Sequence, residues 1–115
     1  MLISIITVVY NGENYIRKTM DSVLCQNFKD YEYIVIDGLS QDNTVNIARE
    51  YEASFEGRLK IYSEKDNGIY DAMNKGIKIA KGQWINFMNA GDAFSNSNVI
   101  EELTKKKAFE DSDLV

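Results

Sequence analysis

The run of β-branched and other apolar residues from Ile3 to Val9 constrains the fold more than any other feature of this sequence. It is too continuous for a strand that has one face in water, which would alternate apolar and polar residues. A run of this kind is typical of a strand buried on both faces, as in a parallel sheet covered by helices. The pair Asn11-Gly12 then supplies a turn that ends the strand.

Strand and helix signals alternate along the rest of the chain. Further strands are expected at Tyr31–Ile36, Leu59–Tyr62 and Gln83–Met88, and Asp113-Leu114-Val115 has the pattern of another strand beginning. One helix is expected with Ile16, Met20, Val23 and Leu24 on an apolar face, and a second from a cap at Asp42 or Asn43 to about Tyr51. A third is expected from Ile69 to Ala80, with Ile69, Met73, Ile77 and Ala80 in an apolar stripe and Gly82 as left-handed cap, and a fourth from Asn98 to about Phe109. Short connections between alternating elements predict an α/β fold with a mainly parallel sheet and helices on both faces.

The composition removes several classes of function. The chain has 115 residues, a net charge of −5 and no histidine. The absence of histidine excludes Ser-His-Asp and Cys-His nucleophile systems and histidine-bound metals, and the acidic balance argues against a nucleic-acid surface. The single cysteine, Cys25, excludes an internal disulfide and is expected to be a buried structural thiol. Any metal ligands must be oxygens, which selects Mg²⁺, Mn²⁺ or Ca²⁺.

The location of the protein is expected to be cytoplasmic. No apolar run approaches the roughly 18 residues that cross a bilayer. The start, Met1-Leu2-Ile3-Ser4, lacks the basic flank and cleavage site of a signal peptide.

Polar residues and glycines collect where the expected strands end. They are Tyr10, Asn11 and Gly12 after the first strand, Asp37, Gly38, Ser40 and Asp42 after the second, Glu64, Lys65, Asp66, Asn67 and Gly68 after the third, and Asn89, Gly91 and Asp92 after the fourth. Ligands of open α/β sheets bind outside the carboxyl ends of the strands, so these loops are expected to form one site. A leaving diphosphate is stabilised by a divalent cation that is held by a carboxylate and by phosphate oxygens, and glycines let the backbone approach such a ligand closely.

Four segments, in order, resemble family 2 glycosyltransferases with the GT-A fold. The segments are Ile5–Gly12, Tyr33–Thr44 with its Asp-Gly-x-Ser-x-Asp-x-Thr pattern, Asp66–Ile77, and Phe87–Asp92 at the place of the family's Asp-x-Asp element. The third segment is most similar to a subgroup linked to exopolysaccharide and colanic-acid-type assembly. The resemblance implies a Rossmann-like GT-A nucleotide-binding half covering residues 1–115, with the acceptor-binding part absent.

The resemblance also implies the roles of individual residues. The nucleotide-sugar site would consist of Thr7, Tyr10, Asn11, Asp37, Asp66, Asn74 and Asn89, with Asp92 as the metal ligand. Thr7, Tyr10 and Asn11 would line the base pocket, partly through backbone groups, and Asp37 would accept a hydrogen bond from the base. Asp66 and the face of the helix that carries Asn74 would border the ribose and phosphates, and Asp92 would hold Mn²⁺ or Mg²⁺ against the diphosphate.

One position departs from the family pattern, and several others have structural alternatives. Relatives often have aspartates where this chain has Asn89 and Gly91, so Asp92 alone would carry the metal, and metal binding would depend on the nucleotide. Asp42 is expected either to cap a helix or to touch the ligand, and Asp71 either to serve the helix dipole or to touch the ligand. Tyr70 is expected in the core or in the site, and Trp84 and Phe87 in the core.

The resemblance implies an inverting, metal-assisted transfer of a sugar from a nucleotide-diphosphate donor, with uridine as the default base, to a glycan or lipid-linked acceptor in surface polysaccharide synthesis. No residue here matches the general base, so we expect the chain to bind nucleotide without efficient transfer. A non-catalytic nucleotide-sugar-binding module remains an alternative. Dinucleotide-dependent oxidoreductases are excluded because Tyr10–Asn14 lacks a Gly-x-Gly-x-x-Gly pattern. We also expect that an exposed sheet edge could pair with a second copy to form a homodimer. Peripheral membrane association is expected only through other segments or partners.

Overall fold

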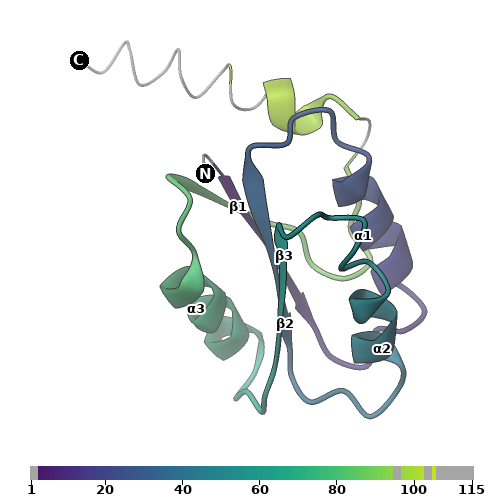
Figure 1. Ribbon diagram of the computed structural model, residues 1–115. Coiled ribbons are helices and arrows are strands. Elements are labelled where there is room, and N and C mark those ends of the chain that lie inside the picture. Colours follow the sequence, from purple (N-terminus) through teal and green to yellow (C-terminus); the bar gives the residue numbers. More distant parts are fainter. Residues whose placement is uncertain (1–2, 95–96, 103–104, 106–115) are drawn as a thin grey trace.

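The computed structural model describes residues 3–94, 97–102 and 105 (Figure 1). Its sheet has four strands, all parallel, in the spatial order β3-β2-β1-β4. The strands are β1 (Ile3–Val9), β2 (Tyr31–Asp37), β3 (Leu59–Ser63) and β4 (Trp84–Phe87). The expected strands are thus confirmed to within a residue or two at each end.

Helices cover both faces of the sheet, as expected for a sheet of parallel strands (Figure 1). Helices α1 (Ile16–Leu24) and α2 (Thr44–Arg49) lie on one face, and α3 (Ile69–Ile79) lies on the other. Residues 99–102 are also helical, and the remainder of the helix expected to run to about Phe109, like the strand expected at Asp113, lies outside the described residues. Within the described part of the chain, no helix is long and apolar enough to cross a membrane.

Alternate side chains of β1 and β2 point to opposite faces of the sheet and pack into two separate hydrophobic cores. The larger core lies under α1 and α2 and contains Ile5, Tyr33 and Phe55, all fully buried. The smaller core lies under α3 and is built on Ile6 and Ile34. Both faces of these strands are therefore buried, which explains why their sequence is continuously apolar.

The two β4 residues expected in the core pack against it. Trp84 is half-buried against the larger core and Phe87 against the smaller one. Cys25, in contrast, is exposed, so the expected buried thiol is wrong. Cys25, the C-cap residue, lies nine positions after buried Ile16, which at about 100° per residue places it on the opposite side of the axis of α1.

Helix α3 packs through its smallest residues, which corrects the expected apolar stripe. Its buried residues are Ala72 and Gly76, whereas Ile69 and Ile77 are half-exposed at 50% and 44%. A Cβ atom on Gly76 would lie 2.8 Å from Cγ2 of Ile6, so the helix approaches β1 too closely for a larger side chain. Sequence periodicity picked out the large apolar residues, but backbone proximity decides which side faces the sheet.

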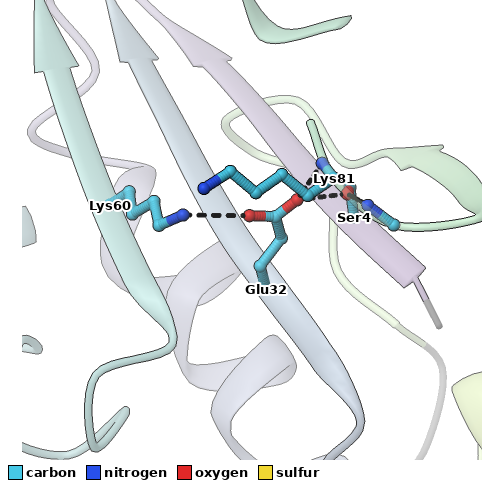
Figure 2. Close-up of polar contacts among 5 residues, drawn as sticks. Ser4, Glu32, Lys60 and Lys81 are labelled. Atoms are coloured by element: carbon cyan, nitrogen blue, oxygen red, sulfur yellow. Dashed lines mark hydrogen bonds and ion pairs between the residues drawn. The ribbon is translucent and has the colours of Figure 1, made fainter. Parts of the chain in front are cut away.

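A buried carboxylate ties three strands together at the amino ends of the sheet (Figure 2). Glu32 on β2 is 1% exposed and accepts hydrogen bonds from the Ser4 hydroxyl at 2.6 Å and from the Lys81 amide. Lys60 on β3 donates to its other oxygen at 3.3 Å. Burial alone would raise the pKa of Glu32, but these hydrogen bonds and the charge of Lys60 outweigh it and lower the pKa.

The same network explains why a glycine stands at position 82. Gly82 donates to the Ser4 hydroxyl at 2.8 Å and is not in the left-handed conformation expected of a helix cap. A Cβ atom added to Gly82 would lie 2.5 Å from the Ser4 amide nitrogen. The turn after α3 therefore passes too close to β1 for any residue other than glycine.

Candidate nucleotide-sugar site

Two neighbouring pockets lie at the carboxyl ends of β1, β2 and β3. The larger, of about 360 Å³, is lined by Tyr10, Gly38, Leu39, Gln41, Lys65 and Asp66. The smaller, of about 280 Å³, is lined by Val8, Val9, Tyr10, Asp66, Gly68 and Ile69. Tyr10 and Asp66 belong to both, so the pockets form a continuous depression at the rim where the sequence placed a ligand.

Asp37, the last residue of β2, lies beneath this rim and organises it. Its side chain is fully buried and accepts hydrogen bonds from the Ser40 amide at 2.9 Å, from the Ser40 hydroxyl, and from the Ser63 hydroxyl at 2.8 Å. Three donors occupy most of the acceptor capacity of a carboxylate, which is about four lone-pair sites. Asp37 therefore fixes the loop after β2 to the end of β3, with room for about one further donor.

The loops after β1 and β2 are joined by reciprocal hydrogen bonds. The Asn11 amide donates to the Ser40 hydroxyl, and the Asn11 side-chain oxygen accepts from the Gln41 amide, both at 2.8 Å. Asn11 holds a left-handed backbone with φ 49°, as does Leu39 with φ 62°. The Asn11 side chain thus serves the loop structure, and the exposed Tyr10 beside it remains available to a ligand.

Asp42 supports the same pair of loops. Its carboxylate accepts from the Thr44 amide at 3.0 Å, at the start of α2, and from the Glu13 amide at 3.2 Å. Burial would raise the pKa of Asp42, but the hydrogen bonds from Thr44 and Glu13 outweigh it and lower the pKa. The N-cap of α2 is Asn43, which makes no side-chain cap hydrogen bond, and Asp42, one residue earlier, bonds the first amide of the helix. Contact of Asp42 with a ligand stays a prediction.

Asp66 lines both pockets, and its position depends on Gly38, which leaves space for the carboxylate, and on Lys75, which holds the loop. A Cβ on Gly38 would lie 2.6 Å from Oδ2 of Asp66, so the carboxylate occupies the space that a side chain at position 38 would fill. The loop that carries Asp66 is fastened to α3, because Lys75 donates to the Lys65 carbonyl at 2.6 Å and Asp71 accepts from the Asn67 amide at 2.9 Å. Asp71 is thus engaged within the loop.

Two of the residues predicted to bind the nucleotide sugar, Tyr10 and Asp66, line the pockets, and the others do not: Thr7, Asn11, Asp37, Asn74 and Asn89. The Thr7 side chain is fully buried on the face of the sheet that α1 and α2 cover. There its hydroxyl forms hydrogen bonds with the Tyr33 hydroxyl at 2.6 Å and the Met88 carbonyl at 2.5 Å. Asn74 is exposed on α3 and lines neither pocket. Tyr70 is 80% exposed, so its expected core role is wrong.

The fourth loop, after β4, carries the candidate metal ligand. Asp92 is exposed, and its amide donates to the Asn89 carbonyl at 2.9 Å, which closes a turn. Gly91 within the turn has φ +100°, a conformation that favours glycine over aspartate. The side-chain oxygen of Asn89 is buried and has no hydrogen-bond partner, whereas no cluster of three or more acidic, histidine or cysteine side chains occurs in the described residues.

The structural role of the hydroxyl groups was not predicted from the sequence, although Ser40 was placed at the rim. Ser40, Ser63 and Thr44 hold the acidic loops in place, and Thr19 of α1 holds the loop after β4. The available signal was their position, since Ser40 and Ser63 stand at or just beyond the end of a strand.

Comparison with known proteins decides the family. The model of the family described as "Glycosyl transferase family 2" matches residues 4–115. The chain belongs to glycosyltransferase family 2. A PGL/p-HBAD biosynthesis glycosyltransferase of Mycobacterium bovis is 35% identical to it over 118 residues, covering 99% of this chain and 45% of the relative. The putative teichuronic acid biosynthesis glycosyltransferase TuaG of Bacillus subtilis is 33% identical over 102 residues, covering 89% of this chain and 40% of the relative.

Solved structures of glycosyltransferases share the fold. S. aureus TarS 1-349 in complex with UDP-GlcNAc superposes with a TM-score of 0.85 at 28% identity, covering 91% of this chain and 30% of TarS. The mannosyltransferase PcManGT of Pyrobaculum calidifontis, in complex with GDP-Man and Mn²⁺, has a TM-score of 0.79 at 22% identity over 85% of this chain and 30% of PcManGT. The expected α/β fold of the GT-A type is confirmed. This family 2 chain spans less than half the length of these curated relatives.

Proposed function

We propose that this glycosyltransferase chain binds the nucleotide part of a nucleoside-diphosphate sugar in the two pockets that meet at Tyr10 and Asp66. The observation that carries the proposal is the position of these pockets at the carboxyl ends of three parallel strands, above a buried aspartate whose loop is already ordered. Complexes of similar folds with UDP-GlcNAc, UDP and GDP-Man support it.

The residues of the rim suit the parts of a nucleotide. Tyr10 is 58% exposed and offers an aromatic face on which a base can stack. Asp37 has acceptor capacity left for one donor of a base, and Asp66 can accept hydrogen bonds from ribose hydroxyls. Thr7 can contribute to such binding only through its backbone, because both uses of its hydroxyl are taken inside the core.

The loop after β4 has an oxygen donor set that fits a divalent cation. Asp92 offers an exposed carboxylate, and Asn89 has a buried oxygen without a partner. Mg²⁺ is commonly bound through one or two carboxylates together with substrate phosphates, so a single carboxylate suits an ion that arrives with the nucleotide. Bound Mn²⁺ or Mg²⁺ would neutralise charge on the departing diphosphate.

The proposed activity of the whole protein is sugar transfer with inversion to a glycan or lipid-linked acceptor in surface polysaccharide synthesis. Relatives named for teichuronic acid and PGL/p-HBAD biosynthesis support this class of product. The general base and acceptor surface are proposed to lie in segments outside this chain, since Asp66 is the one carboxylate among the described residues that line the two pockets. A cytoplasmic location, at the inner face of a membrane when partners bring it there, belongs to the same proposal.

The test is a thermal-shift panel of UDP, GDP and dTDP, each with and without Mn²⁺. The expected result is stabilisation by one nucleotide, larger with the metal, because ligands that bind only the folded state raise its stability. The variant Tyr10→Ala should lose this stabilisation, whereas Tyr15→Ala, which removes an equally exposed tyrosine outside both pockets, should keep it. Stabilisation by none of the three nucleotides would contradict the proposal.

A second candidate is a non-catalytic donor-binding module. It is favoured by Gly91, whose φ of +100° shapes the turn and leaves Asp92 as the sole carboxylate of its loop. A longer form of the protein that binds a nucleotide sugar but neither transfers nor hydrolyses it would support this candidate.

A further inference from the structure

The loop that carries Asp92 is held from α1 by one buried hydroxyl group. Thr19 is fully buried, and its hydroxyl accepts a hydrogen bond from the Gly91 amide at 2.9 Å while donating one to the Asp92 carbonyl at 2.6 Å. These two hydrogen bonds fix the backbone on both sides of the Gly91–Asp92 peptide bond. A threonine hydroxyl can donate one hydrogen bond and accept others, so this arrangement uses both functions of the group.

Two further side chains, one on α1 and one just beyond it, form hydrogen bonds with the segment that follows Asp92. The Ser22 hydroxyl accepts from the Phe94 amide at 3.2 Å, and the Gln26 side chain accepts from the Ile100 amide at 3.1 Å. Thr19 and Ser22 are three residues apart and share one side of α1, and Gln26 lies just beyond the end of the helix. Of the three, only Thr19 contacts the residue proposed as the metal ligand.

The loop is joined to β1 by the Ala90 amide, which donates to the Val8 carbonyl at 3.4 Å, whereas Thr19 provides the side-chain contacts to Gly91 and Asp92 themselves. Asp92 is exposed, and the turn from Asn89 is closed by a single backbone hydrogen bond of 2.9 Å. A left-handed glycine inside the turn adds conformational freedom in the absence of external contacts. The direction of the Asp92 carboxylate therefore depends on where its own carbonyl is held, and Thr19 holds it.

We infer that Thr19 is a positioning residue that orients Asp92 toward a divalent cation shared with a bound nucleoside diphosphate. The inference rests on the proposed function. Groups that orient a metal ligand through hydrogen bonds commonly change metal affinity by about 10–100-fold when they are removed. Thr19 is expected to act on the metal-dependent part of nucleotide binding and to leave the metal-free part unchanged, since it lies on the α1 side of the loop and lines neither pocket.

The experiment is calorimetric titration of UDP into the 115-residue chain with and without Mn²⁺, with the electron paramagnetic resonance spectrum of Mn²⁺ as a second readout of ion binding. The variant Thr19→Val keeps the shape and removes the hydroxyl. Thr19→Ala removes the same hydroxyl without placing a methyl group against the loop, and it replaces the valine variant if that does not fold. Thr19→Ser keeps the hydroxyl, and Ser22→Ala removes a loop contact two residues beyond Asp92.

In the wild type, Mn²⁺ is expected to increase UDP affinity. Thr19→Val is expected to reduce this gain by about 10-fold with metal-free affinity unchanged, whereas Thr19→Ser and Ser22→Ala retain the gain. A full gain in Thr19→Val, or an equal loss of metal-free affinity, would overturn the inference alone. If UDP binds the wild type equally with and without Mn²⁺, the metal part of the proposed function fails, and the assignment of Thr19 fails with it.

Discussion

At the scale of single residues, the rim of the sheet is organised by carboxylates that accept several hydrogen bonds at once. Asp37 accepts from Ser40 and Ser63, and Asp42 accepts from Thr44 and the Glu13 amide. Each of these acids follows or ends β2, yet its partners come from several segments of the chain. The loops are therefore ordered before any ligand arrives, which lowers the entropic cost of binding.

Replacing Asp37 by asparagine tests this organisation. Asp37→Asn puts an NH₂ group among the Ser40 and Ser63 donors, so at least one buried group loses its partner. The free energy of unfolding is expected to fall by roughly 1–3 kcal/mol, with loss of nucleotide binding. Urea denaturation followed by circular dichroism measures the first effect. Glu56→Gln, at an exposed site, is the control, and equal stability of the two variants would contradict the assignment.

Gly38 provides a test that separates binding from stability. In Gly38→Ala the new Cβ would meet the Asp66 carboxylate, which is the movable end of a side chain, so Asp66 shifts out of both pockets. Stability is expected to change by no more than about 0.5 kcal/mol, while nucleotide affinity falls about 10-fold. In an Asp66→Ala background the same substitution should have no effect on affinity, and an additive loss would count against the coupling.

The sequence identified the acidic residues of the site better than their chemical roles. Asp37 and Asp66 could be placed at the rim because strand ends are legible in a single chain. The hydroxyls of Ser63 and Thr19 could not be assigned, since each acts across 26 or more positions of sequence. The hydrogen bonds of the Thr7 side chain could not be predicted for the same reason, since its partners Tyr33 and Met88 are distant in the sequence and lie in the core.

At the scale of elements, α3 shows why the strands were easier to predict than the helix faces. A strand buried on both sides is visible as a continuous apolar run, so Ile3–Val9 was predicted with its correct ends. The docked side of α3 depends on backbone proximity, which an amphipathic pattern does not encode. Ala72 and Gly76 allow the helix to lie close to Ile6, and the larger Ile77 is left half-exposed.

The variant Gly76→Ala tests this close docking. Alanine raises helix propensity by about 1 kcal/mol, but its Cβ would stand 2.8 Å from the stiff, fully buried Ile6 side chain. Overpacking of this kind costs typically 1–3 kcal/mol, so a net loss of about 1 kcal/mol is expected. Thermal unfolding measures it, with the exposed Lys78→Ala on the same helix as control. A rise in melting temperature for Gly76→Ala would show that the helix can move away at little cost.

The Glu32 network predicts a pH dependence at the opposite end of the strands. The folded state lowers the pKa of Glu32 below 4.5, so its contribution is fully present above the unfolded value and is lost as the pH falls through the folded value. Glu32→Gln should therefore be less stable than the wild type by roughly 1–3 kcal/mol at pH 7, and the difference should shrink below about pH 4.5. Urea midpoints from pH 3 to pH 7 measure this, and a difference that is constant over the range would contradict it.

At the scale of the whole molecule, the two ends of the sheet have different compositions. The amino ends are closed by the Glu32 network, which joins β1, β2, β3 and the turn before β4 through Ser4, Lys60 and Lys81 (Figure 2). The carboxyl ends carry open pockets, an exposed Tyr10 and the exposed Asp92. Rigidity at one end and accessible polar groups at the other are what a fold needs to present a ligand site on fixed strands.

The difference in length between this chain and its curated relatives leads to a prediction about activity. The pockets and the candidate metal loop lie within residues that this chain contains, whereas the relatives are more than twice as long. We expect the isolated chain to bind UDP in the presence of Mn²⁺, with a stabilisation of about 2.7 kcal/mol at a ligand concentration of 100 times Kd. Incubated with UDP-GlcNAc and monitored for released UDP, the same sample should show no turnover above the protein-free rate, because positioning of an acceptor and its base supplies much of the rate. UDP release that depends on the chain and is abolished by Asp92→Asn would show that residues 1–115 already contain a complete catalytic set, and the general base would then have to be sought among Asp37, Asp66 and their neighbours.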